Sequence, residues 1–259
     1  MVEKIKKIKN ILLSILIPVV VVLFWYYATN YTEVSGSILP KISKVGTAFE
    51  DLVQKGQLQQ DLSVSIGRVI KGYGVSIILG VLLGTFMGMS KNIWHIFHLT
   101  TTTIRQIPMI AWIPLIILWC GIGELSKVVI IVLAAFFPIM VNTLSGISST
   151  PQGYIEVAQL YKLSKWKTFT KVYLPHALPQ IFVGLKLGLG TSWMAVVAAE
   201  LIAASSGIGY RLSDARSLMR SDVVIVCMIV IGIIGILMDK VLTLIFGALT
   251  PWEKKGQKV

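Results

Sequence analysis

The few side chains that could do chemistry in this 259-residue sequence include two charges inside one long apolar run. Glu200 and Lys186 both lie in this run. A charge in apolar surroundings is costly, so such a residue usually faces a cavity or pairs with a partner. We interpret Glu200 as one half of a structural ion pair or as part of a gate. Its candidate partners are Arg211, Arg216 and Arg220, whereas Lys186 can extend its long side chain to an interface.

No group of residues in the sequence predicts a catalytic or metal site. His95 and His98 are three residues apart, which suits a metal site, but no carboxylate or cysteine accompanies them, so we expect no metal. The sequence contains no H-E-x-x-H zinc motif and no G-x-S-x-G element. It also lacks the G-x-x-x-x-G-K-[ST] loop that cradles nucleotide phosphates. We therefore expect no enzyme activity, no ATP hydrolysis and no bound cofactor in this chain.

The composition is that of a membrane protein. Hydrophobic residues make up 55% of the chain and charged residues 14%, against roughly 25% charged in soluble domains. The net charge of +12 would suggest nucleic acid as the partner of a soluble protein. Here the basic residues fall between apolar runs, where they fit the rule that cytoplasmic loops are basic. We expect a lipid bilayer and no nucleic acid as the surroundings of this chain.

Six apolar stretches are long enough to cross a bilayer, which takes about 20 residues per helix. They are Ile11–Ala28, Val69–Met89, Ile104–Cys120, Val128–Ile147, Ile181–Ala203 and Val223–Leu249. The sequence thus predicts an all-α membrane protein of about six transmembrane helices. We expect one transmembrane domain over residues 11–250, with an outer loop at 29–68 carrying short amphipathic helices and a cytoplasmic loop at 148–180. Residues 1–10 and 251–259 are then cytoplasmic tails.

The flanks of the first stretch set the orientation. Four lysines precede it and the aromatic residues Trp25, Tyr26 and Tyr27 end it, as in a helix anchored at both interfaces. A cleaved signal peptide is the alternative, but the run is long for one and no small-x-small cleavage site follows. The lysines place the N-terminus in the cytoplasm, and six spans return the C-terminus to the same side.

Glycines and prolines within the stretches predict close packing and bends. Gly80, Gly84 and Gly88 recur every four residues, as do Gly184 and Gly188, and small residues let membrane helices approach closely. The contact is either within the chain or with a second subunit. Three prolines, Pro108, Pro114 and Pro138, each remove a backbone hydrogen bond within the third and fourth stretches. Such breaks suit either a translocation path or plain kinked packing.

The loop at 148–180 predicts a helix-turn-helix. Thr150 followed by Pro151 suits a helix start, and a helix then runs through residues 154–161. Ser164 can cap a second short helix, Lys165–Tyr173, which Leu174 and Pro175 would end, before Pro179 opens the fifth span. The element is amphipathic and basic. It could coat a lipid surface or dock in a groove of a cytoplasmic partner.

Three motifs in order resemble a known family. Glu156-Val157-Ala158, a spacer and then Val172-Tyr173-Leu174-Pro175 resembles the EAA loop of permeases of binding-protein-dependent ABC importers. Residues 107–115 (IPMIAWIPL) with 119–124 (WCGIGE), and residues 199–210 (AELIAASSGIGY), are similar to the nitrate/sulfonate/taurine branch. The resemblance covers roughly residues 60–250. One departure is Lys162, where the family usually has a glycine suited to a left-handed turn.

The resemblance implies a type I ABC importer permease in a bacterial inner membrane. It implies a permease homodimer, two ATP-binding cassette ATPase subunits that hold ATP and Mg, and an extracytoplasmic substrate-binding protein. The coupling residues that it implies are Glu156, Val157, Ala158, Lys162, Leu174 and Pro175. The candidate pathway or outer-gate residues are Pro108, Trp112, Pro114, Glu200, Ser205, Ser206, Gly207 and Tyr210.

The resemblance implies a small solute: a sulfonate, taurine, nitrate, bicarbonate or a vitamin precursor. The basic outer loop leans slightly towards an anion. Other hypotheses are a secondary transporter or channel that works without an ATPase, an intramembrane enzyme and a purely structural anchor. ATP-dependent uptake in the presence of partner subunits would separate them.

Overall fold

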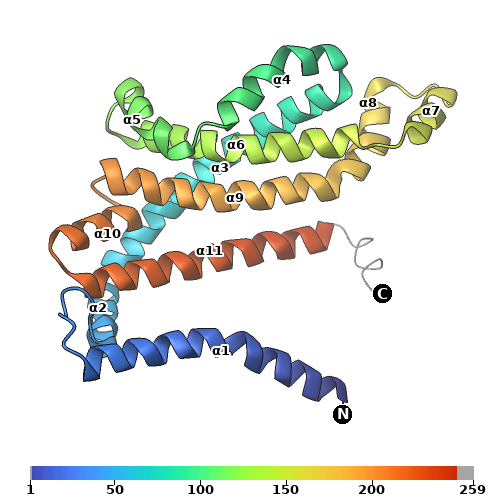
Figure 1. Ribbon diagram of the computed structural model, residues 1–259. Helices are drawn as coiled ribbons and strands as arrows, with labels where there is room; N and C mark the ends of the chain where they lie inside the picture. Colours follow the sequence, from blue (N-terminus) through green and yellow to red (C-terminus); the bar gives the residue numbers. More distant parts are fainter. Residues whose placement is uncertain (1, 250–259) are drawn as a thin grey trace. The chain divides into compact units, whose positions relative to one another are not determined.

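The computed structural model describes residues 2–249 and the side chains of residues 13–248. The described part is built from helices joined by short connections (Figure 1). Their bounds are α1 Val2–Tyr31, α2 Ile42–Gln54, α3 Gln57–Met89, α4 Lys91–Arg105, α5 Met109–Cys120, α6 Glu124–Ser148, α7 Gln152–Leu160, α8 Lys165–Thr168, a π-helical turn Phe169–Tyr173, α9 Leu174–Ala203, α10 Ile208–Ser217 and α11 Ser221–Leu249.

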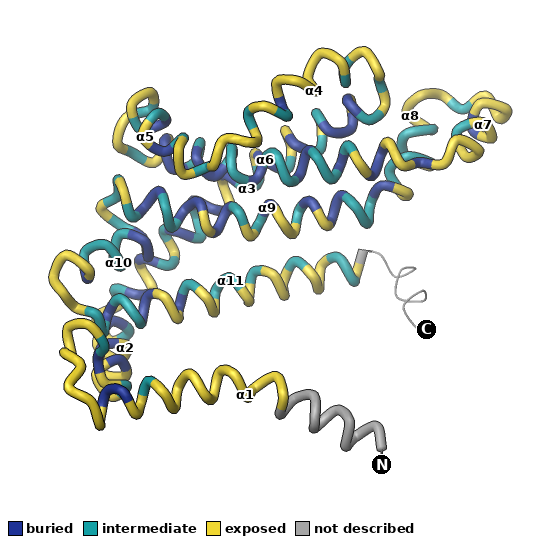
Figure 2. Tube along the Cα trace, viewed as in Figure 1, coloured by how far each residue is buried: buried dark blue, intermediate teal, exposed yellow. Residues whose placement is uncertain are grey.

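The chain forms two compact units. Of the described residues, one unit contains those up to Gln59 together with Arg211–Ile229, and the other contains Gln60–Tyr210 and those from Val230 to Leu249. In the first unit, the Trp25 indole donates to the carbonyl of Pro40 at 2.9 Å. The apolar side chains of α1 that the structure describes, from Leu13 onwards, are largely exposed, which suits a helix surrounded by lipid (Figure 2). The second unit carries the candidate sites.

Within the described residues, five helices are long and apolar enough to cross a membrane, and α4 with α5 supplies a sixth span only if the pair is counted together. This agrees with the prediction of about six transmembrane helices. The predicted third span, Ile104–Cys120, is wrong as a continuous helix, because α4 and α5 meet at 100°. Pro108 lies in the break, directly before α5. Proline disfavours helical backbone in the residue before it, so the break falls where the sequence cannot continue α4.

The predicted outer loop at 29–68 is only partly a loop. It contains one amphipathic helix, α2, which buries Val45, Ala48 and Leu52. Its second half is not a separate surface element, because α3 already begins at Gln57. Hydropathy places the start of the α3 span too late, at Val69. The first turns of α3 carry polar residues, and three of these, Asp61, Ser65 and Arg68, are buried.

The glycines of α3 and α9 both pack against α6. A Cβ at Gly84 would lie 2.6 Å from the Met140 carbonyl oxygen, and Gly80 and Gly88 make similarly close approaches to α6. From α9, a Cβ at Gly188 would lie 2.8 Å from Cγ1 of Ile139. The close contact predicted from the glycine spacing is therefore made within the chain. The antiparallel helices α6 and α9 lie side by side along their length (Figure 1).

The proline within α6 leaves a carbonyl that α9 satisfies. Pro138 has no N–H to donate to the carbonyl of Ala134, one turn earlier. The Thr191 hydroxyl of α9 donates to this oxygen at 3.1 Å. The Asn142 amide donates to the Pro138 carbonyl at 2.8 Å and accepts from Gln180 at 2.8 Å. Neighbouring helices thus satisfy the polar groups that a membrane interior would leave without partners.

Candidate functional site

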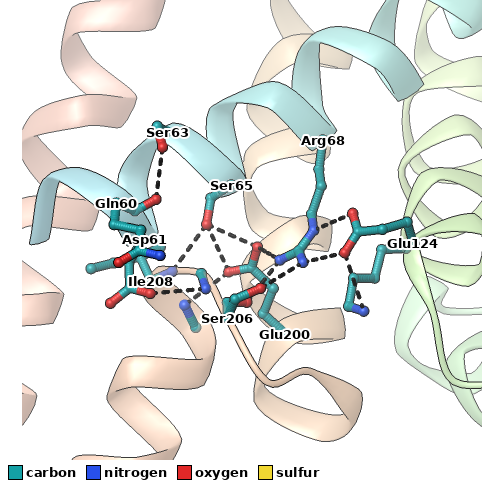
Figure 3. A network of polar contacts seen from close by, with 12 residues as sticks. Gln60, Asp61, Ser63, Ser65, Arg68, Glu124, Glu200, Ser206 and Ile208 are labelled. Atoms are coloured by element: carbon teal, nitrogen blue, oxygen red, sulfur yellow. Dashed lines mark hydrogen bonds and ion pairs between the residues drawn. The ribbon is translucent and has the colours of Figure 1, made fainter. Parts of the chain in front are cut away.

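A buried polar network centres on Arg68 of α3. Its side chain is 3% exposed, and its guanidinium contacts two carboxylates at once (Figure 3). Nη1 donates to Glu200 of α9 at 2.6 Å, while Nε donates to Glu124 of α6 at 2.9 Å and Nη2 contacts the second oxygen of Glu124. The Glu200 carboxylate is fully buried, whereas that of Glu124 is 64% exposed. One arginine therefore joins three helices at the same end of the unit.

The same network fastens the turn that follows α9. Arg68 Nη1 donates to the Ser206 carbonyl at 2.8 Å, and Nη2 donates to the Ser206 hydroxyl at 3.1 Å. Ser65 donates to the Glu200 carboxylate at 2.8 Å and accepts from the Ile208 N–H at 3.0 Å. Two of these bonds use backbone groups of the turn, the Ser206 carbonyl and the Ile208 N–H. Arg68 and Ser65 therefore bind both the Glu200 carboxylate and the turn.

Glycine is required where this turn crosses the carboxylate. Gly207 has φ of +107°, a conformation that side chains rarely adopt, and a Cβ there would overlap the Glu200 carboxylate. Its N–H donates to Asp61 at 3.1 Å. Gly209 donates its N–H to Glu200 at 2.9 Å. The conformation and the space together explain why the turn reads Gly-Ile-Gly.

The structure pairs Glu200 with Arg68, which was not among its predicted partners. Asp61, Ser65, Arg68 and Glu124 were all missed as site residues. A signal was present: Asp61, Ser65 and Arg68 follow each other at intervals of four and three residues, which places them on one helix face. Among the other predicted gate residues, Ser206 and Gly207 belong to the network, Ser205 is exposed and Tyr210 is half-buried.

The break between α4 and α5 borders a hollow of about 350 Å³ on one side of α6. Pro108 and Trp112, two predicted pathway residues, line it, whereas Pro114 is exposed elsewhere on α5. Arg105 is the charged residue at its wall. The full lining is Ile104, Arg105, Ile107, Pro108, Met109, Trp112, Leu133, Ala134, Phe137, Pro138, Val141 and Asn142.

The predicted helix-turn-helix is present, and Lys162 takes the left-handed turn that the family assigns to glycine. Its φ is +48°. The Leu163 N–H donates to the Ala158 carbonyl and the Lys162 N–H to the Gln159 carbonyl, at 3.0 and 2.9 Å. These are the two bonds of a Schellman motif, in which one residue must be left-handed. The lysine therefore preserves the geometry of the turn, at a cost on the order of 1 kcal/mol.

Two details of this segment differ from the prediction. Thr150 does not cap α7: its hydroxyl is buried and finds no partner among the described residues. Leu174 and Pro175 do not end a helix but form the first turn of α9, so Pro179 lies inside that helix. Pro175 is tolerated at the second position of α9 because the first N–H groups of a helix need no intrahelical acceptor. Ser164 does cap α8, accepting from the Lys167 N–H at 3.4 Å.

The second half of this segment folds back against α7 and leaves a groove of about 480 Å³. Ala158 is buried beneath it, whereas Glu156 is exposed and Val157 is 51% exposed. The groove is lined by Tyr154, Val157, Ala158, Tyr161, Leu163, Lys171, Val172, Pro175 and His176. Elsewhere, His98 stacks on Trp94 with ring centroids 4.1 Å apart, and His95 meets the same indole edge-on.

Comparison with known proteins identifies the family. Residues 76–255 match the family described as the binding-protein-dependent transport system inner membrane component. The chain belongs to this family. It is 34% identical to a putative aliphatic sulfonate transport permease of Bacillus subtilis, over 93% of this chain and 87% of that protein. It is 37% identical to the taurine transport system permease of Escherichia coli, over 77% and 73% of the two chains.

A solved structure shows the same fold. A chain of the MetNI methionine ABC transporter in an inward-facing conformation superposes with a TM-score of 0.57 at 17% identity, covering 69% of this chain and 91% of that one. The fold is that of a type I ABC importer permease. The chain is thus a multi-pass permease subunit of an ATP-driven importer in the nitrate/sulfonate/taurine branch. The secondary-transporter hypothesis finds no support among these relatives.

Proposed function

We propose that this permease passes a small sulfonate-type anion, delivered by a binding protein, across the cell membrane. The observation that carries the proposal is the similarity to relatives named for aliphatic sulfonates and for taurine over most of this chain. Both solutes carry a sulfonate group on a short carbon skeleton. The hollow beside Arg105 offers a single cation among apolar walls, which is compatible with such a solute.

The partners follow from the family. We propose a homodimer of this chain with two separate ATPase subunits, which bind ATP and Mg, and with an extracytoplasmic binding protein. Both termini and the α7–α8 segment would face the cytoplasm. The lysines at 162, 165, 167 and 171 support this orientation, because basic residues concentrate in cytoplasmic loops.

The α7–α8 segment would couple the ATPase to the membrane helices. An exposed helix beside an apolar groove suits insertion into a cleft of a partner. Tyr161 is 77% exposed and Val157 51%, so both sit at the contact surface in this proposal. Leu174 and Pro175 begin α9 and would pass the movement directly into it. Lys162 would keep the two short helices at a fixed angle through its turn.

The Arg68 network would hold the outer end of α9 rather than act as a loose gate. The burial of Glu200 and the number of bonds to the turn at 206–209 support a structural role. A gate built here would have to break several charge-assisted bonds at once, each stronger than an ordinary hydrogen bond.

Reconstitution tests the proposed function. Vesicles containing the permease, its ATPase and its binding protein should take up labelled taurine or ethanesulfonate only when ATP is present. Glu156→Ala should reduce uptake and the ATPase stimulation by loaded binding protein, with normal membrane levels. Gln152→Ala, at the start of the same helix, is the matched control. Uptake driven by an ion gradient without ATP, or unchanged uptake by Glu156→Ala, would count against the assignment of this role.

A further inference from the structure

In a membrane spanned by α6, the hollow beside the α4–α5 break lies at the depth of the hydrocarbon. It contacts α6 between Leu133 and Asn142. These positions are in the middle part of α6, which runs over 25 residues from Glu124 to Ser148. Because the break exposes backbone at this depth, it suits a wall of a water-filled cavity better than a surface against lipid.

Arg105, in the last turn of α4, has no ion pair or side-chain hydrogen bond among the interactions found in the described part of the chain. It is exposed at the wall of this hollow. Arg68, by contrast, has two carboxylates. An arginine at membrane depth with no carboxylate partner is costly unless water or an anion reaches it. Its guanidinium can bind a tetrahedral oxyanion through two parallel N–H groups.

The rest of the wall selects against inorganic ions. Trp112, Leu133 and Phe137 face the hollow, with several other apolar side chains. The Asn142 amide is already engaged by Gln180 and by the Pro138 carbonyl. One cation beside apolar walls fits a ligand with an anionic head and a short aliphatic part. The volume of about 350 Å³ is in the range of small-molecule sites.

We propose that this hollow is a transient binding site for the solute within the membrane, with Arg105 binding its anionic group and Trp112 and Phe137 contacting its carbon chain. This inference rests on the proposed function for the class of solute. A lipid phosphate offers Arg105 the same chemistry, so the experiment must distinguish a free solute from a headgroup.

Thiol labelling tests the site without requiring transport. The full chain, assembled with its partners in vesicles of phosphatidylcholine and with its native cysteines replaced, receives Val141→Cys as a reporter in the hollow. Two methanethiosulfonates are compared, one bearing an ethylsulfonate and one an ethyltrimethylammonium group. A cation at the wall of a cleft between apolar surfaces raises the local concentration of anions roughly tenfold or more, so the anionic reagent should react at least about tenfold faster.

Substitutions in α4 show which residue causes the preference for the anionic reagent. Arg105→Gln should abolish the preference for the anionic reagent and Arg105→Lys should retain most of it. Lys91→Gln removes the same charge from the exposed start of α4 and should leave the preference unchanged. Butanesulfonate should slow labelling in the Arg105 protein, which shows that a free solute rather than a lipid headgroup reaches the site, while 1-butanol should not, which shows that the anionic group is required.

The inference is overturned by an unreactive Val141→Cys, by a preference that survives Arg105→Gln, or by the absence of protection by butanesulfonate. Failure of the proposed function gives a different result. In that case ATP-driven sulfonate uptake is missing although labelling still shows an Arg105-dependent anion preference. Normal uptake without that preference would instead reject the hollow and leave the proposed function intact.

Discussion

The two ion pairs of Arg68 should contribute very differently to stability, although they share one guanidinium. Glu200 is fully buried in the pair, whereas the Glu124 carboxylate is 64% exposed. Exposed ion pairs contribute about 0.2–1 kcal/mol because water screens them. Breaking a buried pair by removing one partner costs about 3–5 kcal/mol, because the other charge stays buried without compensation.

Three substitutions should therefore rank in a fixed order. Arg68→Met leaves Glu200 buried without its cation and should cost about 3–5 kcal/mol of unfolding free energy. Glu200→Gln should cost less, about 2 kcal/mol, because Glu124 still neutralises Arg68 and the Gly209 N–H keeps an acceptor. Glu124→Gln should cost under about 1 kcal/mol. The double substitution Arg68→Met with Glu200→Gln should cost at least about 1 kcal/mol less than the two single costs added, because the charges are removed together.

Unfolding by sodium dodecyl sulfate in phospholipid–detergent micelles, followed by tryptophan fluorescence, gives these free energies. The proteins must first show the same helix content and the same elution volume. A cost for Glu124→Gln equal to that of Glu200→Gln would refute the argument from burial. Strict additivity in the double variant would show that Arg68 and Glu200 are not coupled in the folded protein.

Three further substitutions test local features in the same unfolding assay. Lys162→Gly should stabilise the turn after α7 by about 1 kcal/mol, because glycine adopts a positive φ without strain; a loss of stability would contradict the left-handed geometry. Gly84→Ala should destabilise by about 1–3 kcal/mol through overlap with α6, whereas Gly74→Ala on the same helix meets open space and should be neutral or stabilising; equal effects would refute the α3–α6 contact. Thr191→Val should cost about 1 kcal/mol by leaving the Ala134 carbonyl without its donor, and no change would show that this carbonyl has another partner.

The number and approximate positions of the long helices could be predicted, because a bilayer requires long apolar segments. A span needs about 20 apolar residues whatever its partners are, so runs such as residues 128–147 and 223–249 identify α6 and α11. The glycine repeats also predicted contact correctly, because helices in lipid pack most closely where side chains are smallest. The α7–α8 motif was found through its resemblance to a family and through the capping residue Ser164.

The Arg68 network could not be predicted by the same reasoning. Polar residues at the end of an apolar run look like loop residues, and hydropathy does not tell whether another helix will bury them. Arg68 became a helix residue with two partners because Glu124 and Glu200, 56 and 132 residues away, return to the same place. The break at Pro108 was missed for a related reason: the contacts around it come from distant parts of the chain, and proline alone does not distinguish a kink from a 100° turn.

The contacts of α6 explain how a movement at α7 could reach the far end of the unit. At the end near α7, Ile147 is packed by Gly88 of α3 and by Ala177 of α9. At the opposite end, Arg68 ties the same three helices together through Glu124 and Glu200. Helices fastened at both ends in a close-packed core resist bending. A displacement imposed on α7 should therefore tilt α3, α6 and α9 together. The α4–α5 break is not part of these contacts, so the change in angle can be taken up there.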